Sequence, residues 1–358
     1  MKEKGKKGAL HQVLSTFAAI GSKHINIVFN APNKSHFAHI APVISKLIED
    51  MPSHINIIIT CSSDIEIHHP NITHLFSSTQ LPLWKRIDLF ITTEFDVPYW
   101  LKTRTIFFGH GIGPKLTYQT SRELSSFDHI FTACQPIHEA QQEVVGSEKI
   151  IKIGLPILDE ISPKLEAIES YHQLDKHKKT ILYAPSWSNQ AEQLPNLPKI
   201  LKKLDTMDEV NLIVSPHPNL LDKNLCKGID FFSNKKEYKN IILNTAPSPF
   251  NTFDIAVFSD IVISDISSIF FEAAALGKIT ILDGNRATFK HYGAEKVYDQ
   301  IIDSNQVIDW DTFSTTDITD NFKLDLFSCK REQFIDRYLF NRNKATDKFI
   351  RTIFQLLE

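Results

Sequence analysis

The sequence has few cysteines, no strong excess of charge and no long apolar run. Its four cysteines, Cys61, Cys134, Cys226 and Cys329, are far apart and form no CxxC pair. This spacing indicates no zinc site, and it favours reduced thiols in a cytosolic protein. The net charge of -3 argues against nucleic-acid binding over the whole chain.

The chain also lacks a membrane-spanning run and a secretory signal. No stretch approaches the ~18–20 apolar residues that are needed to cross a bilayer. The start MKEKGKKGAL is basic, but the run after it, HQVLSTFAAI, is short and not strongly apolar. We therefore expect a cytoplasmic protein with a solvated N-terminus. The alternative is a peripheral position on the inner face of the cell membrane, because basic residues near the start can contact an anionic surface. These residues are Lys2, Lys4, Lys6 and Lys7.

The 358 residues suit two domains of roughly 150 residues each. In the first half, short apolar runs alternate with helical spacing, and 36–51 is the clearest predicted helix. Fully apolar strands between helices indicate a parallel sheet that is covered on both faces. The predicted strands are 24–30, 54–60, 86–93, 104–109 and 127–134, and 149–161 closes this half.

A polar segment, 161–178, is the predicted linker, and a second series of strands and helices follows it. Two such series predict an α/β protein of the GT-B type, with two Rossmann-like domains facing a cleft. The second series has predicted strands at 180–187, 209–218, 240–244, 260–265 and 278–284, helices at 194–207 and 269–277, and an amphipathic helical stretch from Glu332.

We expect three parts: an N-terminal acceptor-side domain over 1–165, a nucleotide-donor domain over 166–325, and C-terminal helices over 326–358 that pack back across the domains. Ligands of such sheets bind beyond the carboxyl ends of the strands. Because the motifs below all lie at strand ends, they are expected to share one cleft.

The segment GHGIGPK (109–115) directly follows a predicted strand. Its glycines, Gly111 among them, allow a sharp turn and a close approach of the backbone to a ligand. His110 stands where a base that titrates near neutral pH is useful, and Lys115 can neutralise a phosphate. The spacing is neither the dinucleotide-binding fingerprint nor a Walker loop. A tight turn with a structural histidine is the alternative.

Two further strands end in loops that contain proline. Ser186 can donate to a phosphate, and Trp187 can cover a base or a sugar. His217 lies between two prolines, the second of which is Pro218. A histidine held rigidly in this way can bind a diphosphate or donate a proton to it. The alternatives are a strand terminator with a buried tryptophan and a surface histidine between turn prolines.

The strongest single feature is a predicted buried strand that ends in Asp265, after which two serines begin a helix. A helix N-terminus offers free N–H groups and a partial positive charge. The hydroxyls of Ser267 and Ser268 would complete a phosphate site, and ordinary N-capping by serine is the alternative. Glu272 lies one turn further on, where it can hold a ribose hydroxyl or face the solvent.

His36 and His39 begin the first predicted helix, on the side of the expected cleft, and can receive an acceptor hydroxyl. Their His-x-x-His spacing also suits a metal ion. However, the chain has 15 histidines in all, and no third ligand is evident in the sequence. We therefore expect no metal and no cofactor.

Taken in order, these motifs resemble the CDP-glycerol glycerophosphotransferases that build teichoic-acid-type polymers. The family pattern runs H-G-T-P-x-K, G-x-P-R-x-D, Y-A-P-T-W, H-P and a D-Y-S-S helix start, with a later D-G-K-A-[ST] segment. The resemblance covers about residues 100 to 350, and its specificity comes from the order of the motifs. The matching segments are HGIGPK (110–115), GLPILD (154–159), YAPSW (183–187), HP (217–218), DISS (265–268) and NKAT (343–346).

The chain departs from the family pattern at positions that bear on the donor. Ile112 and Gly113 replace Thr-Pro with one extra residue, and Ile157 stands where the family often has arginine. Ser188 and Ile266 stand where the family commonly has arginine and tyrosine. These changes remove cations and a tyrosine from the expected donor site.

The resemblance implies transfer of a glycerol-phosphate or related polyol-phosphate unit from a CDP-linked donor to an acceptor hydroxyl, with release of CMP. It implies His110 as general base and His217 as the group that assists the departing phosphate. Ser267 and Ser268 would hold the donor phosphates, and Lys115 would add positive charge. The implied acceptor is lipid-linked or a glycan, and the product is a cell-surface polymer.

Two other functions stay open on the sequence alone. A GT-B glycosyltransferase would use a nucleotide sugar in capsule or lipopolysaccharide synthesis, with the same donor cleft. A non-catalytic member would bind a nucleotide without turnover.

Overall fold

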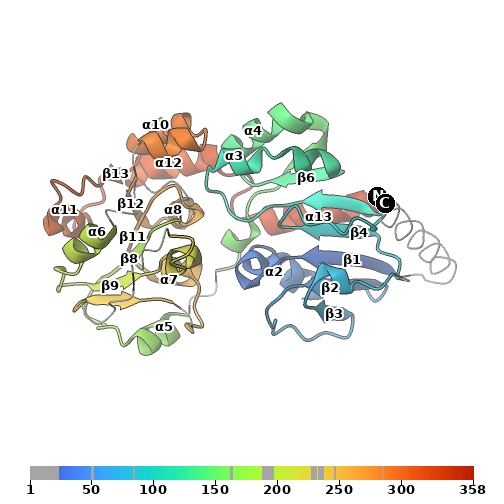
Figure 1. Cartoon of the computed structure of the whole chain (residues 1–358), viewed down its shortest axis with the longest axis horizontal. Helices are drawn as coiled ribbons and strands as arrows, with labels where there is room; N and C mark the ends of the chain where they lie inside the picture. The colour runs from blue at the N-terminus through green and yellow to red at the C-terminus, as the bar shows by residue number, and fades with distance from the viewer. Residues whose placement is uncertain are drawn as a thin grey trace. The chain divides into compact units, whose positions relative to one another are not determined.

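The computed structural model describes residues 24–49, 52–83, 85–161, 164–187, 197–226, 232, 238–245, 247–284 and 286–358. The basic start, Lys2 to Lys7, lies outside these residues, and so does Ser188. The chain divides into two compact units, each built on its own sheet (Figure 1). Every strand pair in both sheets is parallel, which confirms the predicted α/β class. Among the described residues, no helix has the length and apolar character that a membrane span requires.

The first unit comprises Met1–Gly111, Thr117–Glu160 and Leu339–Glu358. Its seven-stranded sheet has the order β3-β2-β1-β4-β5-β6-β7. The strands are β1 (Ile25–Asn30), β2 (Ile55–Thr60), β3 (Ile72–Leu75), β4 (Leu89–Thr92), β5 (Arg104–Phe107), β6 (His129–Thr132) and β7 (Ile150–Lys152), and the helices include α2 (Lys34–Glu49), α3 (Leu116–Gln119), α4 (Gln135–Val145) and α13 (Ala345–Leu357).

The C-terminal helix α13 packs on the first sheet. The Phe349 ring meets Phe108 and Phe131 edge-on, at centroid distances of 5.1 and 5.0 Å. The Asp159 carboxylate accepts a hydrogen bond of 2.6 Å from the Thr346 N–H in the first turn of α13. A carboxylate there satisfies an N–H group that has no partner within the helix.

The second unit comprises Ile112–Leu116 and Ile161–Tyr338. Its six-stranded sheet has the order β10-β9-β8-β11-β12-β13. The strands are β8 (Thr180–Ala184), β9 (Asn211–Val214), β10 (Ile241–Leu243), β11 (Ile261–Ser264), β12 (Ile279–Leu282) and β13 (Gln306–Val307), and the helices include α5 (Leu165–His172), α6 (Leu197–Leu204), α7 (Thr252–Phe258), α8 (Ser268–Ala275), α9 (Arg286–His291), α10 (Glu295–Ile302), α11 (Thr315–Thr319) and α12 (Ser328–Tyr338).

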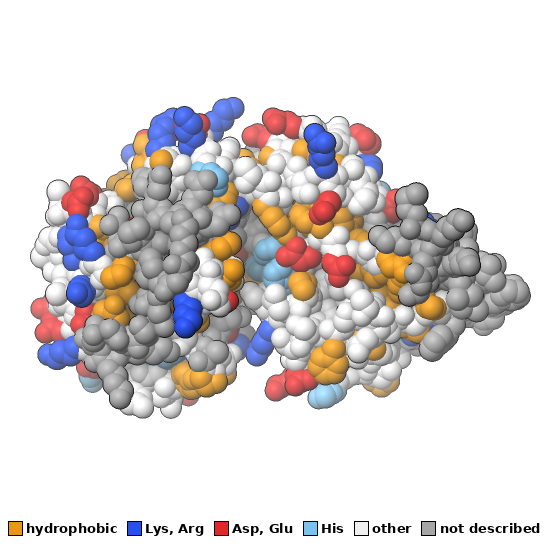
Figure 2. Space-filling model, in the orientation of Figure 1, with side chains coloured by type: hydrophobic (Ala, Val, Ile, Leu, Met, Phe, Trp, Pro, Cys, Tyr) orange, Lys and Arg blue, Asp and Glu red, His pale blue; other side chains and the backbone are white. Residues whose placement is uncertain are grey.

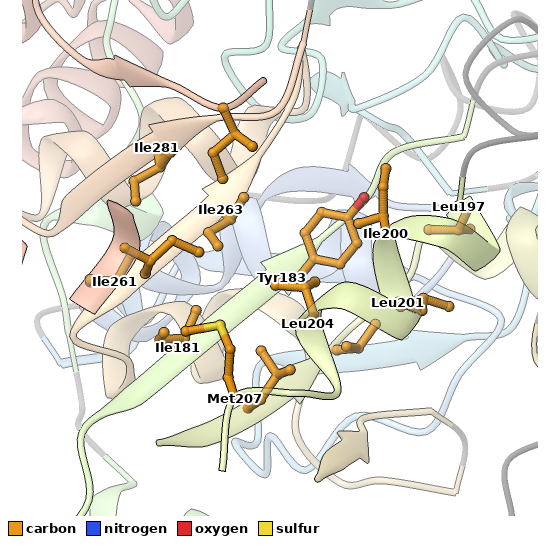
Figure 3. Packing of buried hydrophobic residues seen from close by; sticks show 14 of the residues in the cluster. Ile181, Tyr183, Leu197, Ile200, Leu201, Leu204, Met207, Ile261, Ile263 and Ile281 are labelled. Carbon is orange, nitrogen blue, oxygen red and sulfur yellow. The ribbon is translucent and has the colours of Figure 1, made fainter. Parts of the chain in front are cut away.

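Apolar spacing along α6 explains how this helix packs. Its buried side chains recur at i, i+3, i+4 and i+7, which places them on one face of a helix. That face packs on the apolar side chains of β8, β11 and β12 (Figure 3). The buried residues of α6 are Leu197, Ile200, Leu201 and Leu204.

The other face of the second sheet is covered as well. Val262 and Leu182 belong to a separate buried cluster that includes Ile255 of α7 and Ala273 of α8. Strands buried on both faces need the continuous apolar runs that this sequence has.

The prediction of a polar linker over 161–178 is wrong for its central part, because α5 occupies Leu165–His172. Ile168 is 1% exposed and joins the same buried cluster as α7 and α8. A helix of eight residues buries little, so its few apolar positions gave only a weak periodic signal.

The two C-terminal helices belong to different units. Helix α12 lies in the second unit, whereas α13 lies in the first. The predicted amphipathic stretch from Glu332 is therefore interrupted at 339–344, where Asn341 and Asn343 adopt positive φ values of 45° and 61°. Asparagine tolerates this conformation better than most residues, and continuous helix cannot pass through it.

We expect Gly154→Ala to destabilise the first unit strongly. Gly154 has a φ of +97°, and a Cβ atom there would lie 2.3 Å from the carbonyl oxygen of Phe340. The backbone would have to shift, in addition to the cost of about 1–2 kcal/mol for an alanine at positive φ. In urea unfolding followed by circular dichroism, the free energy of unfolding should fall by about 3 kcal/mol or more.

Gly109→Ala is the matched control in the same unit. Gly109 also has a positive φ of +72°, but a Cβ atom there would meet its nearest neighbour at 3.5 Å, an ordinary contact. This variant should therefore lose only the cost of positive φ, about 1–2 kcal/mol. Equal losses in the two variants would show that the approach of Phe340 is not what requires glycine at 154.

Candidate functional site

The predicted site residues fall into two groups, one in each unit. The first group lies at the carboxyl ends of β1, β4 and β5, which are neighbours in the sheet. His36 is in the first turn of α2, which follows β1, Glu94 follows β4, and His110 follows β5. Figure 2 shows histidine side chains next to acidic ones on the surface of the molecule.

These three side chains are in contact with one another. The rings of His36 and His110 lie 3.8 Å apart between centroids. Glu94 Oε1 is 3.6 Å from His36 Nε2 and 3.6 Å from His110 Nδ1. Thus one carboxylate faces two imidazoles.

Thr93 and Tyr118 hold this group in place. The Thr93 hydroxyl lies 3.1 Å from His36 Nδ1, and the Thr93 carbonyl oxygen lies 3.2 Å from His110 Nδ1. The Tyr118 hydroxyl donates to the other carboxylate oxygen of Glu94. Each member of the group therefore has a partner that fixes its orientation.

Burial keeps the histidines of α2 neutral. It is the main cause that lowers the pKa of His36 to about 3, and the nearby His110 lowers it further. Burial likewise lowers the pKa of His39 to about 3, with a smaller contribution from His110. His39 Nδ1 is buried without a hydrogen-bond partner, and His39 is not part of the three-residue group.

Sequence reasoning missed Glu94, Thr93 and Tyr118. Glu94 directly follows the predicted strand 86–93, so its place at a strand end was the available signal. The sequence showed no third metal ligand beside His36 and His39, but the structure shows other neighbours for His36. The structure brings Glu94 and His110 to His36, and it leaves His39 outside.

The second group lies around the N-terminus of α8, and Ser267 is the N-cap residue. The Ser267 side chain makes no capping hydrogen bond, so plain capping does not explain this hydroxyl. Its backbone N–H instead donates to Asp265 Oδ1 at 3.1 Å. Ser268 Oγ accepts a hydrogen bond of 2.8 Å from the Gly113 N–H.

The second half of the GHGIGPK segment thus packs on this helix N-terminus. Lys115 lies near the Asp265 carboxylate, and its ammonium contacts the Trp187 carbonyl oxygen at 3.4 Å and the Tyr292 ring at 5.5 Å. Burial lowers the pKa of Lys115, and Asp265 opposes this shift. Burial raises the pKa of Asp265, with Lys115 and Ser186 opposing. A phosphate beside Lys115 would reduce the cost of burying its charge.

Ser186 has a different partner from the predicted phosphate. Its backbone N–H and its hydroxyl both donate to Asp265 Oδ2, at 3.2 and 2.7 Å. The hydroxyl proton is therefore committed to a buried carboxylate. This corrects the expectation for Ser186, which orients Asp265 in this structure.

His217 and Trp187 lie against each other. Their rings stack at a centroid distance of 6.4 Å and an angle of 26°. His217 is exposed, and its Nδ1 accepts a hydrogen bond from the Asn219 N–H, so the neutral ring carries its proton on Nε2. Pro218 begins the short helix that follows and is exposed. Trp187 also packs on the core around α6.

A cavity of about 240 Å³ lies next to this group, between α6 and the ends of β8 and β12. Asp283 on its wall accepts hydrogen bonds from the Tyr183 hydroxyl at 2.7 Å and from Trp310 Nε1 at 2.6 Å. Burial raises the pKa of Asp283 to about 6. With Asp265 and Asp309 also on the wall, the cavity suits hydroxyl or amino groups better than phosphate.

Glu272 is 4% exposed, so the alternative in which it faces the solvent is wrong. Its Oε1 has no hydrogen-bond partner, and burial raises its pKa to about 8. A buried polar atom without a partner is rare in a folded protein and calls for an explanation.

The sequence profile described as CDP-Glycerol:Poly(glycerophosphate) glycerophosphotransferase matches residues 103–282. The chain belongs to this family. The match covers the segments that hold His110, Lys115, His217 and the start of α8. The predicted class of enzyme, a transferase for polyol phosphate with a CDP-linked donor, is confirmed at the level of the family. No curated sequence matches the chain.

Solved structures show which fold this glycerophosphotransferase-family chain has. The wall teichoic acid polymerase TagF superposes with a TM-score of 0.68 at 16% identity, covering 99% of this chain and 94% of that chain. A UDP-GlcNAc 2-epimerase from Neisseria meningitidis, bound to UDP-GlcNAc, gives a TM-score of 0.62 at 16% identity, covering 92% and 100%. These similarities confirm the predicted GT-B class of fold.

We expect the buried Glu272 to make stability depend on pH. The unfolded chain loses this proton near pH 4.5, whereas the folded chain keeps it up to about pH 8. Between these values the unfolded state binds fewer protons, so the free energy of unfolding falls as pH rises. The fall from pH 5 to 8 should be on the order of 2–4 kcal/mol.

Glu272→Gln removes the titrating group while preserving its shape. Thermal unfolding of the two proteins across pH 5–8 should therefore diverge, with the wild type losing melting temperature relative to the variant as pH rises. Parallel curves for the two proteins would contradict a buried, protonated Glu272.

Proposed function

We propose that the chain transfers a glycerol-phosphate or related polyol-phosphate unit from a CDP-linked donor to an acceptor hydroxyl and releases CMP. One observation carries this proposal. A single family motif contains both His110, which contacts His36 and Glu94, and Lys115, which lies beside the start of α8. The chemistry needs both a base for the acceptor and positive charge for the donor.

On the donor side, the N-terminus of α8 would hold the phosphates. The first N–H groups of a helix have no partner within it, and they carry a partial positive charge. The Ser267 hydroxyl, which makes no capping bond, and the Lys115 ammonium add a donor and a charge. His217 Nε2–H would donate to the phosphate that leaves as part of CMP.

Glu272 would recognise the ribose of the donor. It lies one helical turn beyond Ser268, and its Oε1 is buried without a partner. Ribose hydroxyls are donors that would satisfy such an oxygen. The Trp187 ring, stacked on His217, would contact the base or the polyol.

On the acceptor side, His110 would act as general base. The Thr93 carbonyl holds the N–H of its Nδ1, so Nε2 carries the lone pair that takes the proton of the acceptor hydroxyl. Glu94 Oε1 lies 3.6 Å from His110 Nδ1 and flanks the ring on its N–H side. His36 and His39 would line the approach of the acceptor. No step of this scheme requires a metal, since positioning and charge carry phosphoryl transfer.

The acceptor and the location are also part of the proposal. TagF is a wall teichoic acid polymerase, and a TagF variant soaked with CDPG is among the similar structures, at a TM-score of 0.65. A lipid-linked or glycan acceptor in cell-surface polymer synthesis fits that likeness. The lysines from Lys2 to Lys7 would then contact the anionic inner face of the membrane.

We expect His110→Ala to lower the rate of transfer by about 10²–10⁴-fold, because a positioned base contributes that much. Affinity for CDP, measured by calorimetric titration, should survive. Transfer is measured as release of CMP from CDP-glycerol in the presence of an acceptor. Loss of CDP affinity instead would place His110 on the donor side.

Ser267→Ala gives the opposite pattern as a control. It removes a hydroxyl from the donor side and leaves the histidine group intact, so it should weaken CDP binding by about 10-fold. If the wild type binds CDP but releases no CMP, the chain is a non-catalytic member of its family. If both variants keep the rate and affinity of an active wild type, neither residue has the proposed role.

We expect Glu272 to be responsible for recognition of the ribose. Calorimetric titration should show tighter binding of CDP than of its 2′,3′-dideoxy analogue, by about 10–100-fold for the wild type. In Glu272→Ala this difference should vanish, because the oxygen that reads the hydroxyls is gone. A difference that persists in the variant would assign ribose recognition to another residue.

The same titration compares CDP with UDP. Selective binding of CDP supports the CDP-linked donor, and selective binding of UDP would instead favour a nucleotide-sugar transferase.

A further inference from the structure

The group formed by His36, Glu94 and His110 has the composition and spacing of a metal site. One ligand atom from each residue lies within 4.8 Å of those from the other two. The three residues are far apart in sequence, but the order of the strands brings them together, since β1, β4 and β5 are adjacent. Among the described residues, this is the group of three or more histidine, cysteine or acidic side chains that meets such spacing.

The ligand types select the kind of cation. Two imidazoles and one carboxylate form the three-ligand set of zinc sites that keep a fourth position open. Magnesium and calcium prefer oxygen ligands, so they fit this group poorly.

The observed distance also fits zinc. Two ligands bound to a tetrahedral zinc ion at its usual bond lengths lie about 3.4 Å apart. His36 Nε2 and Glu94 Oε1 are separated by 3.6 Å, too far for a good hydrogen bond but close to this span.

The outer partners strengthen the case. Metal-binding histidines usually donate their other ring N–H to a nearby oxygen, and metal-binding carboxylates are also hydrogen-bonded. Here Thr93 provides an oxygen to Nδ1 of His36 and another to Nδ1 of His110. Tyr118 donates to Glu94 Oε2 and leaves Oε1 facing Nε2 of His36.

We propose that His36, Glu94 and His110 bind a zinc-type divalent cation and that the bound cation inhibits transfer. Inhibition follows because the cation would take the lone pair that His110 needs as a base. The proposal that the cation binds is independent of the proposed function. The proposal that the cation inhibits transfer rests on the proposed function.

Binding is tested on the full chain after treatment with a chelator, without donor or acceptor. Titration with zinc in competition with a chromophoric chelator should show one strong zinc site per chain. A large excess of magnesium should not displace zinc from this site. His36→Ala and the isosteric Glu94→Gln should each weaken it by about 10–100-fold. The control is His68→Ala, which removes an exposed histidine and should leave the affinity unchanged.

Circular dichroism confirms that each variant is folded before titration. The proposal that the cation binds is overturned if the wild type has no strong site, or if both variants bind zinc as tightly as the wild type does.

Inhibition is tested by CMP release at zinc concentrations that saturate the site. The rate should fall at least about 10-fold in the wild type, in step with occupancy, and chelator should restore it. An unchanged or faster rate with the site filled overturns the proposal that the cation inhibits transfer. A chain without transferase activity would still bind zinc at this site. Failure of the proposed function is therefore distinguishable from failure of the proposed zinc site.

Discussion

The contact between Gly113 and the start of α8 is the constraint on which the group around that helix N-terminus depends. Ser268 accepts the Gly113 N–H, and a Cβ atom at 113 would lie 2.8 Å from the Ser268 backbone nitrogen. Only glycine allows this approach. Tyr338 of α12 fixes the same loop by donating to the Ile112 carbonyl oxygen at 2.6 Å. The loop held in this way keeps Lys115 beside the buried carboxylate of Asp265.

That carboxylate, Asp265, organises the group electrostatically. Burying it is costly unless it is paired and hydrogen-bonded. Lys115 provides the opposite charge, and the N–H groups of Ser186 and Ser267 provide hydrogen bonds from two separate segments. Asp265 therefore joins the end of β8 to the start of α8. Because these bonds use the aspartate and not the Ser267 hydroxyl, that hydroxyl stays available at the helix N-terminus.

Sequence patterns predicted elements whose signal is local and missed what depends on strand order. The spacing of Leu197, Ile200 and Leu204 is visible along the chain, and so are the apolar strands. The contact between Glu94 and His36 cannot be seen along the chain. It depends on the order of the strands, in which β1 lies beside β4 and not at the edge of the sheet. Sequence order alone does not decide that. For the same reason, the sequence pattern pairs His36 with His39. In the structure His36 contacts Glu94 and His110, which follow β4 and β5.

The geometry also separates two kinds of family motif that a sequence match treats alike. Asp159 and Thr346 belong to two motifs, and in the structure they bond to each other and begin α13. This hydrogen bond fixes the start of the C-terminal helix on the first unit, where Phe349 packs on the sheet. His110, by contrast, is oriented by a backbone carbonyl and a carboxylate, and it remains partly exposed. A polar motif residue that is hydrogen-bonded to another motif residue, as Asp159 is to Thr346, stabilises the fold. His110 differs because its orientation is fixed through Nδ1 alone, which is the geometry that the proposed role as a base requires.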